Sequence, residues 1–233
     1  TFNHRMYVIE CLDADPLTGT WTEKGQIKTG WESFSLDATI LQHKGKLYYI
    51  WAQEDRNVNY ESHSNIYIAE MENPWTLRTK PVMLTQPLLD WEIKIFWVNE
   101  GPAILKKNGK IFLTYSASAT DENYCMGMLV VNENDDLLDP KSWKKLEKPV
   151  FKTSYKNKQY GPGHNSFTVS EDGMKDLLVY HARNYTDIEG DPLYDPNRHT
   201  RVQVIEWDKD GFPIFGEPVM DTRNVDFDSL RKK

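Results

Sequence analysis

Cysteines, long apolar runs and clusters of basic residues are scarce or missing in this sequence, and each absence excludes a class of protein. The two cysteines, Cys11 and Cys125, are too few for a disulfide framework, and without a CxxC pair they indicate neither a metal site nor a redox site. We expect both to be buried free thiols. No apolar stretch approaches the roughly 20 residues of a membrane span. The net charge is −7 without any block of Lys or Arg, so we expect neither a nucleic acid nor a membrane as a partner.

A helical pattern is also missing. No long segment carries the apolar period of an amphipathic helix, which argues against a helical repeat. The 233 residues are 39% hydrophobic and 12% aromatic, enough for one good-sized core or two small ones. The chain starts at Thr1 rather than at a methionine, so we expect the true N-terminus to be absent, and the cellular compartment stays undetermined.

The sequence does contain a repeat. Asp37, Glu100 and His164 stand 63 and 64 residues apart, and each opens a short apolar stretch that turns at a glycine. The turn glycines, each followed by a run rich in β-branched and aromatic residues, are Gly45, Gly109 and Gly173. Such pairs of runs predict β-hairpins. A third strand is expected after each hairpin, at 66–71, 126–131 and 201–207.

Apolar β repeats of this size are typical of propeller blades. We therefore predict an all-β fold, a five-bladed β-propeller that lacks its first blade and part of its second. The blades expected within this single domain are approximately 1–32 (partial), 33–95, 96–160 and 161–222. A complete ring would need roughly 320 residues, which places about 85 or more on the N-terminal side of this chain. Either the same gene product or a second chain would supply the missing N-terminal blade.

The polar residues that open the inner strands indicate where chemistry would occur. The innermost strand of each propeller blade faces the central channel, so Asp37, Glu100 and His164 are expected at equivalent positions around one funnel. Two converging carboxyl groups suit glycoside cleavage, because one protonates the leaving oxygen while another acts on the opposite face of the sugar. Carboxylates held close together also raise each other's pKa, which keeps an acid protonated near neutral pH.

The segments SLDATI, WVNEGPAIL and GPGHNSF resemble the inner-strand motifs of glycoside hydrolase family 43, and the similarity extends along nearly the whole chain. The resemblance is greatest to members that act on arabinose-containing glycans. It implies an inverting hydrolase of α-L-arabinofuranosyl linkages in arabinan or arabinoxylan oligosaccharides. By motif position, Glu100 resembles the general acid and Asp37 the aspartate that modulates the pKa of the acid.

By the same resemblance, His164 is similar to the axial histidine of the family, which in several members borders a water-filled channel or a metal ion. No cofactor is required by this chemistry. The resemblance leaves room for a structural calcium or another cation on the propeller axis, contacted by His164 through water. A lone histidine among carboxylates is not a metal-binding spacing by itself.

The general base of the family, an aspartate in the first blade, has no match in this sequence. The four Asp-Pro pairs lie in turns or loops, where Asp and Pro favour turn formation, and they are Asp15-Pro16, Asp139-Pro140, Asp191-Pro192 and Asp195-Pro196. We therefore expect the base in the missing segment, and the chain alone to be inactive without it.

Sugar-binding side chains are expected at the same end of the channel, because sugar C–H faces pack on aromatic rings while hydroxyl groups take hydrogen bonds. The candidates are Trp97, Trp51, Gln53, Tyr115 and Arg201. Packing between blades is the alternative role of each aromatic residue. Arg201 is expected to contact a substrate hydroxyl or Asp37, with Arg183 as the competing choice. The long polar segment 186–198 is expected to form a wall of the site.

Two other functions are compatible with the sequence. A β-xylosidase of the same family would bind a similar set of hydroxyl groups. A non-catalytic carbohydrate-binding propeller would share the fold but would not need Glu100. The two carboxyl groups distinguish these cases, since an enzyme requires Asp37 and Glu100 to face a common space.

Overall fold

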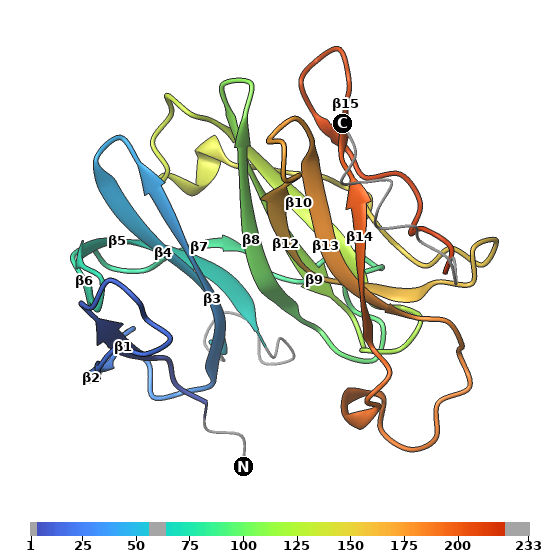
Figure 1. Ribbon diagram of the computed structural model, residues 1–233, viewed down its shortest axis with the longest axis horizontal. Coiled ribbons are helices and arrows are strands. Elements are labelled where there is room, and N and C mark those ends of the chain that lie inside the picture. Colours follow the sequence, from blue (N-terminus) through green and yellow to red (C-terminus); the bar gives the residue numbers. More distant parts are fainter. Residues whose placement is uncertain (1–3, 56–63, 222–233) are drawn as a thin grey trace.

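The computed structural model describes residues 4–55 and 64–221, and in these residues the fold is built from antiparallel β-sheets, as predicted (Figure 1). Helical structure in the described residues is limited to two 3₁₀ turns, Pro140–Ser142 and Pro192–Tyr194. No helix in this part of the chain is long and apolar enough to cross a membrane.

The sheets follow one another along the chain. The first is a two-stranded hairpin, composed of β1 (Tyr7–Cys11) and β2 (Trp21–Gln26). The second contains β3 (Ser35–His43), β4 (Lys46–Gln53), β5 (Asn65–Asn73), β6 (Thr76–Leu77) and β7 (Val82–Thr85). Its order is β3-β4-β5-β6, and β7 also pairs with β5.

The third sheet has the order β8-β9-β10-β11, with β8 (Asn99–Lys107), β9 (Lys110–Ala117), β10 (Cys125–Asn132) and β11 (Lys144–Lys145). The fourth sheet contains β12 (Tyr160–Val169), β13 (Asp176–Arg183) and β14 (His199–Val204). A short pair, β15 (Glu206–Trp207) and β16 (Pro213–Ile214), completes the described chain.

Tight turns join the first two strands of these sheets where the glycines predicted them. Lys44 and Gly45 both have positive φ, at 48° and 75°, and so do Asn108 and Gly109, at 54° and 71°. Two consecutive residues with positive φ are typical of the type I′ turn, whose twist matches that of a β-hairpin. The turns therefore pair the two strands of each predicted hairpin directly, His43 with Lys46 and Lys107 with Lys110.

The sheets are arranged face to face, with their first strands together. β3 lies beside β8, and β8 lies beside β12 (Figure 1). One apolar core, which includes Ile50, Ile68 and Leu113, joins the second sheet to the third. A second core joins the third sheet to the fourth and includes Phe112 and Tyr180. Because both cores exclude water, the three inner strands are fixed relative to one another.

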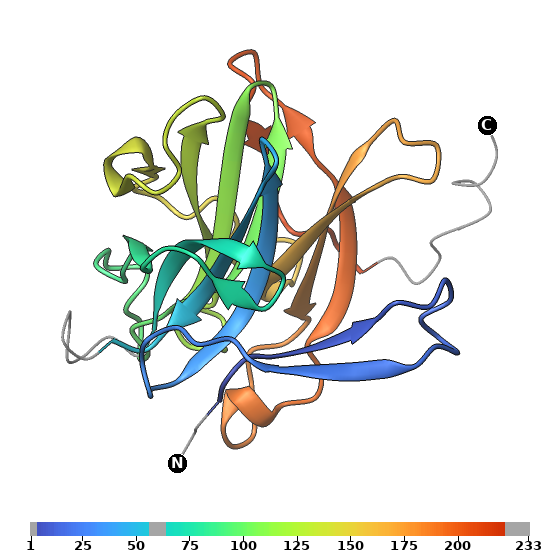
Figure 2. The same cartoon turned by 90° about the vertical axis from the view of Figure 1, so that its left-hand side faces the viewer.

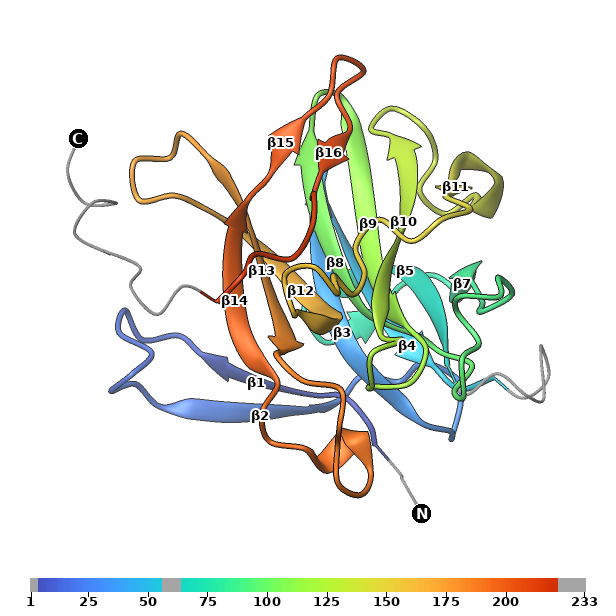
Figure 3. The same ribbon diagram turned by 90° about the vertical axis from the view of Figure 1, so that its right-hand side faces the viewer.

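The β1–β2 hairpin projects away from the other sheets, as Figures 2 and 3 show. One of its faces packs through Met6 and Val8 on the second sheet, against a core that contains Trp51 and Tyr67. Cys125 is buried and Cys11 only half-buried, and both are free. The expectation of two buried thiols is therefore correct for Cys125 alone, because Cys11 lies in the thin hairpin.

Candidate functional site

Each of the three inner strands is interrupted by a β-bulge. The pairing skips two residues between Leu36 and Thr39 on β3, between Glu100 and Ala103 on β8, and between Gly163 and Ser166 on β12. The first skipped residue has positive φ in every case, 53° at Asp37, 57° at Gly101 and 46° at His164. A bulge re-aims the side chains next to it, and such bulges are frequent beside active sites.

The bulges correct the equivalence that the sequence suggested. Asp37 and His164 occupy the same position of their bulges, but the matching residue on β8 is Gly101, and Glu100 precedes the bulge by one residue. The offset arises because Gly101, and not Glu100, takes the position with positive φ on β8. Glycine adopts positive φ without steric cost, whereas a residue that has a side chain is strained there. The repeat alone does not reveal which residue of β8 takes the left-handed position.

The offset brings the two carboxyl groups together. The backbone N–H of Gly101 donates a hydrogen bond to Oδ2 of Asp37, with an N–O distance of 3.1 Å. On the other side, Nε2 of His164 lies 3.9 Å from Oδ1 of Asp37. The structure therefore gathers Asp37, Glu100 and His164 at one place, with Asp37 in the middle.

Glu100 is a half-buried carboxyl group with one close hydrogen-bond donor. The hydroxyl of Ser64, at the N-terminal end of β5, donates to its Oε1 over 2.6 Å. The pKa of Glu100 is raised to about 7: burial is the main cause, the Ser64 hydrogen bond lowers the pKa, and the charge of Asp37 adds a smaller increase. A carboxyl group with such a pKa can donate a proton near neutral pH. Because Ser64 binds Oε1, the other oxygen is available to carry that proton.

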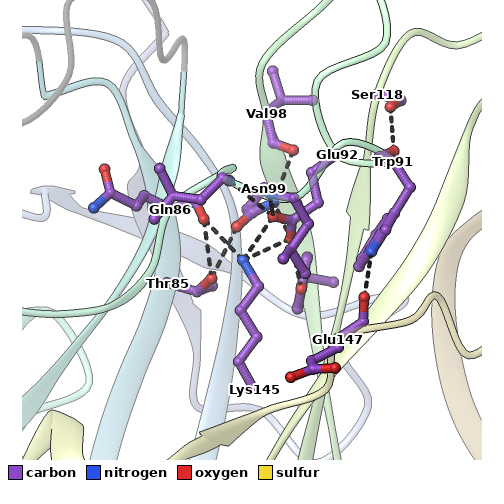
Figure 4. A network of polar contacts seen from close by, with 12 residues as sticks. Thr85, Gln86, Trp91, Glu92, Val98, Asn99, Ser118, Lys145 and Glu147 are labelled. Atoms are coloured by element: carbon purple, nitrogen blue, oxygen red, sulfur yellow. Dashed lines mark hydrogen bonds and ion pairs between the residues drawn. The ribbon is translucent and has the colours of Figure 1, made fainter.

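Behind Glu100 lies a buried ion pair that holds the start of β8 in place (Figure 4). The carboxylate of Glu92 is fully buried and lies 2.7 Å from Nζ of Lys145 on β11. It also accepts hydrogen bonds from the Asn99 side chain and the Tyr115 hydroxyl, at 3.2 and 2.7 Å. The hydroxyl of Thr85, on the preceding sheet, donates to Asn99 over 3.0 Å. Asn99 is thereby linked to both sheets directly before Glu100.

His164 is the outermost ring of an aromatic stack. Its side chain is 48% exposed, and its backbone N–H donates to the Ser116 hydroxyl over 2.8 Å. Its ring stacks on His181, which stacks in turn on Tyr124. Burial is the main cause that lowers the pKa of His181 to about 3, so this ring stays neutral. Gly163 must be a glycine, because a Cβ there would lie 2.5 Å from the Tyr124 ring.

The surroundings of His164 bear on the expected cation. Within the described residues, no three His, Cys, Asp or Glu side chains come together as a metal site. The neighbouring His181 ring is neutral, and both of its nitrogens are buried away from solvent. A cation next to His164 would therefore be held mostly by water.

Three predicted sugar contacts occupy core positions. The structure buries Trp51, Gln53 and Tyr115 completely. Gln53 accepts hydrogen bonds from Trp51 and Thr29, and its amide donates to Ser33 and to the Phe34 carbonyl. Side chains alternate between the two faces of β4 and β9, and these three point into the space between neighbouring sheets. Residue type alone did not show which face each side chain would occupy.

The two arginines are also used for structure. Arg201 binds Gln159 and Asp221 rather than Asp37, at 2.8 and 3.0 Å. Arg183 is buried, and it donates to Asp195 and to the carbonyls of Thr120 and Pro192. Arg183 thus anchors the loop 186–198 through Asp195 and Pro192. The same loop brings Arg198 close enough that its charge adds to the effect of burial in lowering the pKa of His181. The sequence did not indicate this neighbour.

The remaining predictions concern Trp97 and the Asp-Pro pairs. Trp97 is half-buried and lies two residues before β8, so its role as a sugar contact stays a prediction. Asp15, Asp139 and Asp191 each accept a hydrogen bond from the backbone N–H two residues later, at Leu17, Lys141 and Leu193, which confirms their expected role as turn residues. Ser64 was missed, since a lone serine at a strand start gives no sequence signal.

Comparisons with known proteins show the family of this chain. The sequence pattern of Glycosyl hydrolases family 43 matches residues 1–213. The extracellular exo-α-(1→5)-L-arabinofuranosidase of Streptomyces avermitilis is 58% identical over 217 residues, which is 93% of this chain and 45% of that protein. The α-L-arabinofuranosidase 43 of Humicola insolens is 54% identical, with the same two coverages. The chain therefore spans about half the length of these curated relatives.

Solved structures give the same picture. The crystal structure of an α-L-arabinofuranosidase from Lactobacillus brevis is 64% identical, with a TM-score of 0.93, and the match covers 96% of this chain and 69% of that one. An exo-1,5-α-L-arabinanase from a bovine ruminal metagenomic library, at 13% identity and a TM-score of 0.63, shares the fold. That match covers 96% of this chain and 71% of the arabinanase.

Proposed function

Because this chain belongs to glycosyl hydrolase family 43, we propose that the protein is an inverting glycoside hydrolase that acts on α-L-arabinofuranosyl linkages. The proposed substrates are arabinose-containing oligosaccharides derived from arabinan or arabinoxylan. The observation that carries the proposal is the environment of Glu100. This residue accepts a hydrogen bond from Ser64, lies near the charge of Asp37, and has a pKa raised to about 7. The names of the relatives support arabinofuranose over xylose as the sugar that is released.

In this proposal Glu100 is the general acid. It transfers its proton to the glycosidic oxygen as the bond between that oxygen and the anomeric carbon breaks. A water molecule attacks the anomeric carbon from the opposite face and gives its proton to a base, so the configuration inverts. Burial is the main cause that keeps Glu100 protonated until the substrate is bound, and Asp37 contributes to this through its negative charge. The Gly101 N–H and His164 hold the Asp37 carboxylate in position.

The base of this reaction is proposed to lie outside the 233 residues. Of the described carboxylates, only Asp37 raises the pKa of Glu100 through its charge, and it is held by the Gly101 N–H next to the acid. An inverting enzyme needs its base roughly 6.5–9.5 Å from the acid, across the sugar. We propose that a further N-terminal blade supplies it and completes a five-bladed propeller, from the same gene product or from a second chain.

No cofactor takes part in this mechanism. A cation on the propeller axis is proposed only as a structural element, contacted by His164 through water. It would fix the exposed edge of His164 without entering the reaction.

Hydrolysis assays test the proposal. We would measure release of 4-nitrophenol from its α-L-arabinofuranoside and its β-D-xyloside by this chain, by a longer chain with the upstream segment, and by that longer chain carrying Glu100→Gln. We expect arabinofuranoside cleavage by the longer chain only. In the Gln variant we expect a loss of about 10²–10⁴-fold on arabino-oligosaccharides, whose leaving alcohol needs a proton, and a smaller loss on the nitrophenyl glycoside, whose leaving group does not. Glu171→Gln, an exposed turn residue, is the matched control.

Each other outcome contradicts part of the proposal. Faster cleavage of the xyloside would indicate a β-xylosidase. Full activity of the Gln variant would remove Glu100 from the acid role. If no form cleaves either glycoside or arabino-oligosaccharides, a carbohydrate-binding function without catalysis is the better description.

A further inference from the structure

Three rings stack next to the carboxyl groups of the site, and the reaction proposed above involves only the outermost one. The ring centroids of His164 and His181 lie 6.5 Å apart at an interplanar angle of 27°, and those of His181 and Tyr124 lie 5.5 Å apart at 10°. Both distances are typical of offset-stacked rings. His181, on β13, and Tyr124, directly before β10, thus support the exposed ring of His164 from the protein side.

Two glycines make room for this stack. Gly163 pairs with His181 across β12 and β13, and a Cβ at Gly163 would lie 2.5 Å from Cε1 of Tyr124. A side chain there would displace the Tyr124 ring on which His181 stacks. On β8, a Cβ at Gly101 would lie 3.4 Å from Nδ1 of His164, so this ring lies against the backbone of β8. The His164 ring is therefore located by β8 at Gly101 and by β13 at His181.

His181 contributes its ring rather than a hydrogen bond. Both of its ring nitrogens are buried, and neither has a hydrogen-bond partner in the described part of the chain. A buried imidazole without partners is costly for the fold, because its N–H gives up its hydrogen bonds to water. A phenyl ring of similar shape would avoid this cost. The position of His181 is therefore set by its contacts with the neighbouring rings.

The ring of His164 in turn faces Asp37. Its Nε2 lies 3.9 Å from Oδ1 of Asp37, whose Oδ2 accepts the hydrogen bond from the Gly101 N–H at 3.1 Å. Because 48% of the His164 side chain is exposed, its ring depends on the contact with His181 for its orientation. Without that contact, rotation about the Cβ–Cγ bond would move Nε2 away from Asp37 and release one side of the carboxylate.

We propose that His181 is a positioning residue for the acid. Its ring, backed by Tyr124, holds His164 against Asp37, and Asp37 is thereby kept beside Glu100. The inference rests on the proposed hydrolase function and specifies the step that the stack affects. Proton transfer from Glu100 to the leaving oxygen depends on this arrangement, whereas the attack of water on the opposite face of the sugar does not.

Two substrates separate these steps in the full-length protein. The leaving alcohol of α-1,5-arabinobiose needs a proton, whereas the leaving group of 4-nitrophenyl α-L-arabinofuranoside does not. For His181→Ala we expect kcat on arabinobiose to fall about tenfold, and kcat on the nitrophenyl glycoside to change by less than about twofold. His181→Phe keeps a planar ring, so it should restore most of the activity on arabinobiose, with a thermal midpoint at or above that of the parent.

Leu178→Ala is the matched control, because Leu178 lies on the same strand but in the core between the third and fourth sheets. It should lower the thermal midpoint without changing the ratio of the two kcat values. An equal fall on both substrates in His181→Ala would show a merely structural role and overturn the inference. A His181→Phe variant as impaired as His181→Ala would also overturn it, because a polar group and not the ring would then be required.

If the unsubstituted protein cleaves neither compound, the proposed function fails, and the positions of the side chains then test the stack. A crystal structure of His181→Ala should show a distance between Nε2 of His164 and Oδ1 of Asp37 that is longer than 3.9 Å. An unchanged distance would overturn the inference.

Discussion

At the scale of single residues, the chemistry depends on a few groups that act on Glu100 in opposite directions. Burial and the charge of Asp37 raise its pKa, whereas the hydrogen bond from Ser64 lowers it. The balance gives a carboxyl group with a pKa of about 7. The acid on β8 is therefore tuned by Asp37 on β3 and by Ser64, which directly precedes β5.

The two neighbours of Glu100 should shift the pH profile of kcat/KM in opposite directions. Ser64→Ala removes a donor that stabilises the carboxylate, so the pKa of Glu100 rises and the alkaline limb moves to higher pH. Asp37→Asn removes a negative charge, so the pKa falls and the alkaline limb moves to lower pH. The profiles can be measured with an arabino-oligosaccharide in the full-length protein, because its leaving alcohol requires the proton of Glu100. Shifts in the same direction would contradict this assignment of causes.

Glu100 should also make the folded state less stable at alkaline pH. Its pKa is about 7 in the folded protein and near 4.5 when unfolded, so its contribution to stability is complete below pH 4.5 and is lost as the pH rises through 7. We expect Glu100→Gln to gain stability relative to the parent between these pH values, by at most about 3 kcal/mol. Urea unfolding at pH 5 and pH 8 measures this difference. An equal difference at both pH values would show that the carboxyl group is not perturbed.

At the scale of elements, the site depends on how three strands are interrupted and anchored. The bulges on β3, β8 and β12 aim Asp37, Glu100 and His164 toward one place. The Glu92 network then fixes the start of β8 against β11 and against the preceding sheet. The loop 86–98, which carries Glu92, leads directly into β8.

Breaking the buried ion pair should be costly. Glu92→Gln removes a fully buried carboxylate and leaves the half-buried Lys145 without its counter-charge, and removing one partner of a buried pair typically costs roughly 3–5 kcal/mol. Glu10→Gln, which breaks the more exposed pair with Lys24 on the hairpin, should cost less than about 1 kcal/mol. Urea denaturation of both variants checks the contrast. Similar losses in the two variants would contradict the structural role of the Glu92 network.

At the scale of the whole molecule, the first and last sheets of the described chain expose apolar side chains. The hairpin presents Tyr7, Ile9 and Trp21 to solvent, each more than half exposed. On the last three-stranded sheet, Val202 on β14 is 52% exposed. If an additional blade packed against these two sheets, it would cover apolar side chains of this kind.

These faces should make the 233-residue chain self-associate. We expect it to bind the dye ANS and to form oligomers in size-exclusion chromatography with light scattering, because exposed apolar strands pair with other copies. Ile9→Lys together with Val202→Lys should reduce both effects. A longer chain with the upstream segment should be monomeric and bind little dye. A monomeric 233-residue chain without dye binding would contradict the proposed missing blade.

The sequence by itself determined the all-β fold, the strand pairs and the family. Periodic apolar runs and the turns at Gly45 and Gly109 are local signals, so they could be read without the structure. The same signals placed Asp37, Glu100 and His164 at the start of inner strands. They did not distinguish the buried Trp51, Gln53 and Tyr115 from exposed residues, because which side of a strand faces the neighbouring sheet depends on packing.

Only the tertiary structure decided how the site is assembled. The one-residue offset of Glu100 from the bulge and its hydrogen bond to Ser64 involve an unusual backbone conformation and residues far apart in sequence. Such features arise where separate sheets meet, and a local pattern of residue types does not encode them. The pKa of Glu100, on which the proposed chemistry depends, follows from burial and from a charge 63 residues away, both of which exist only in the folded chain.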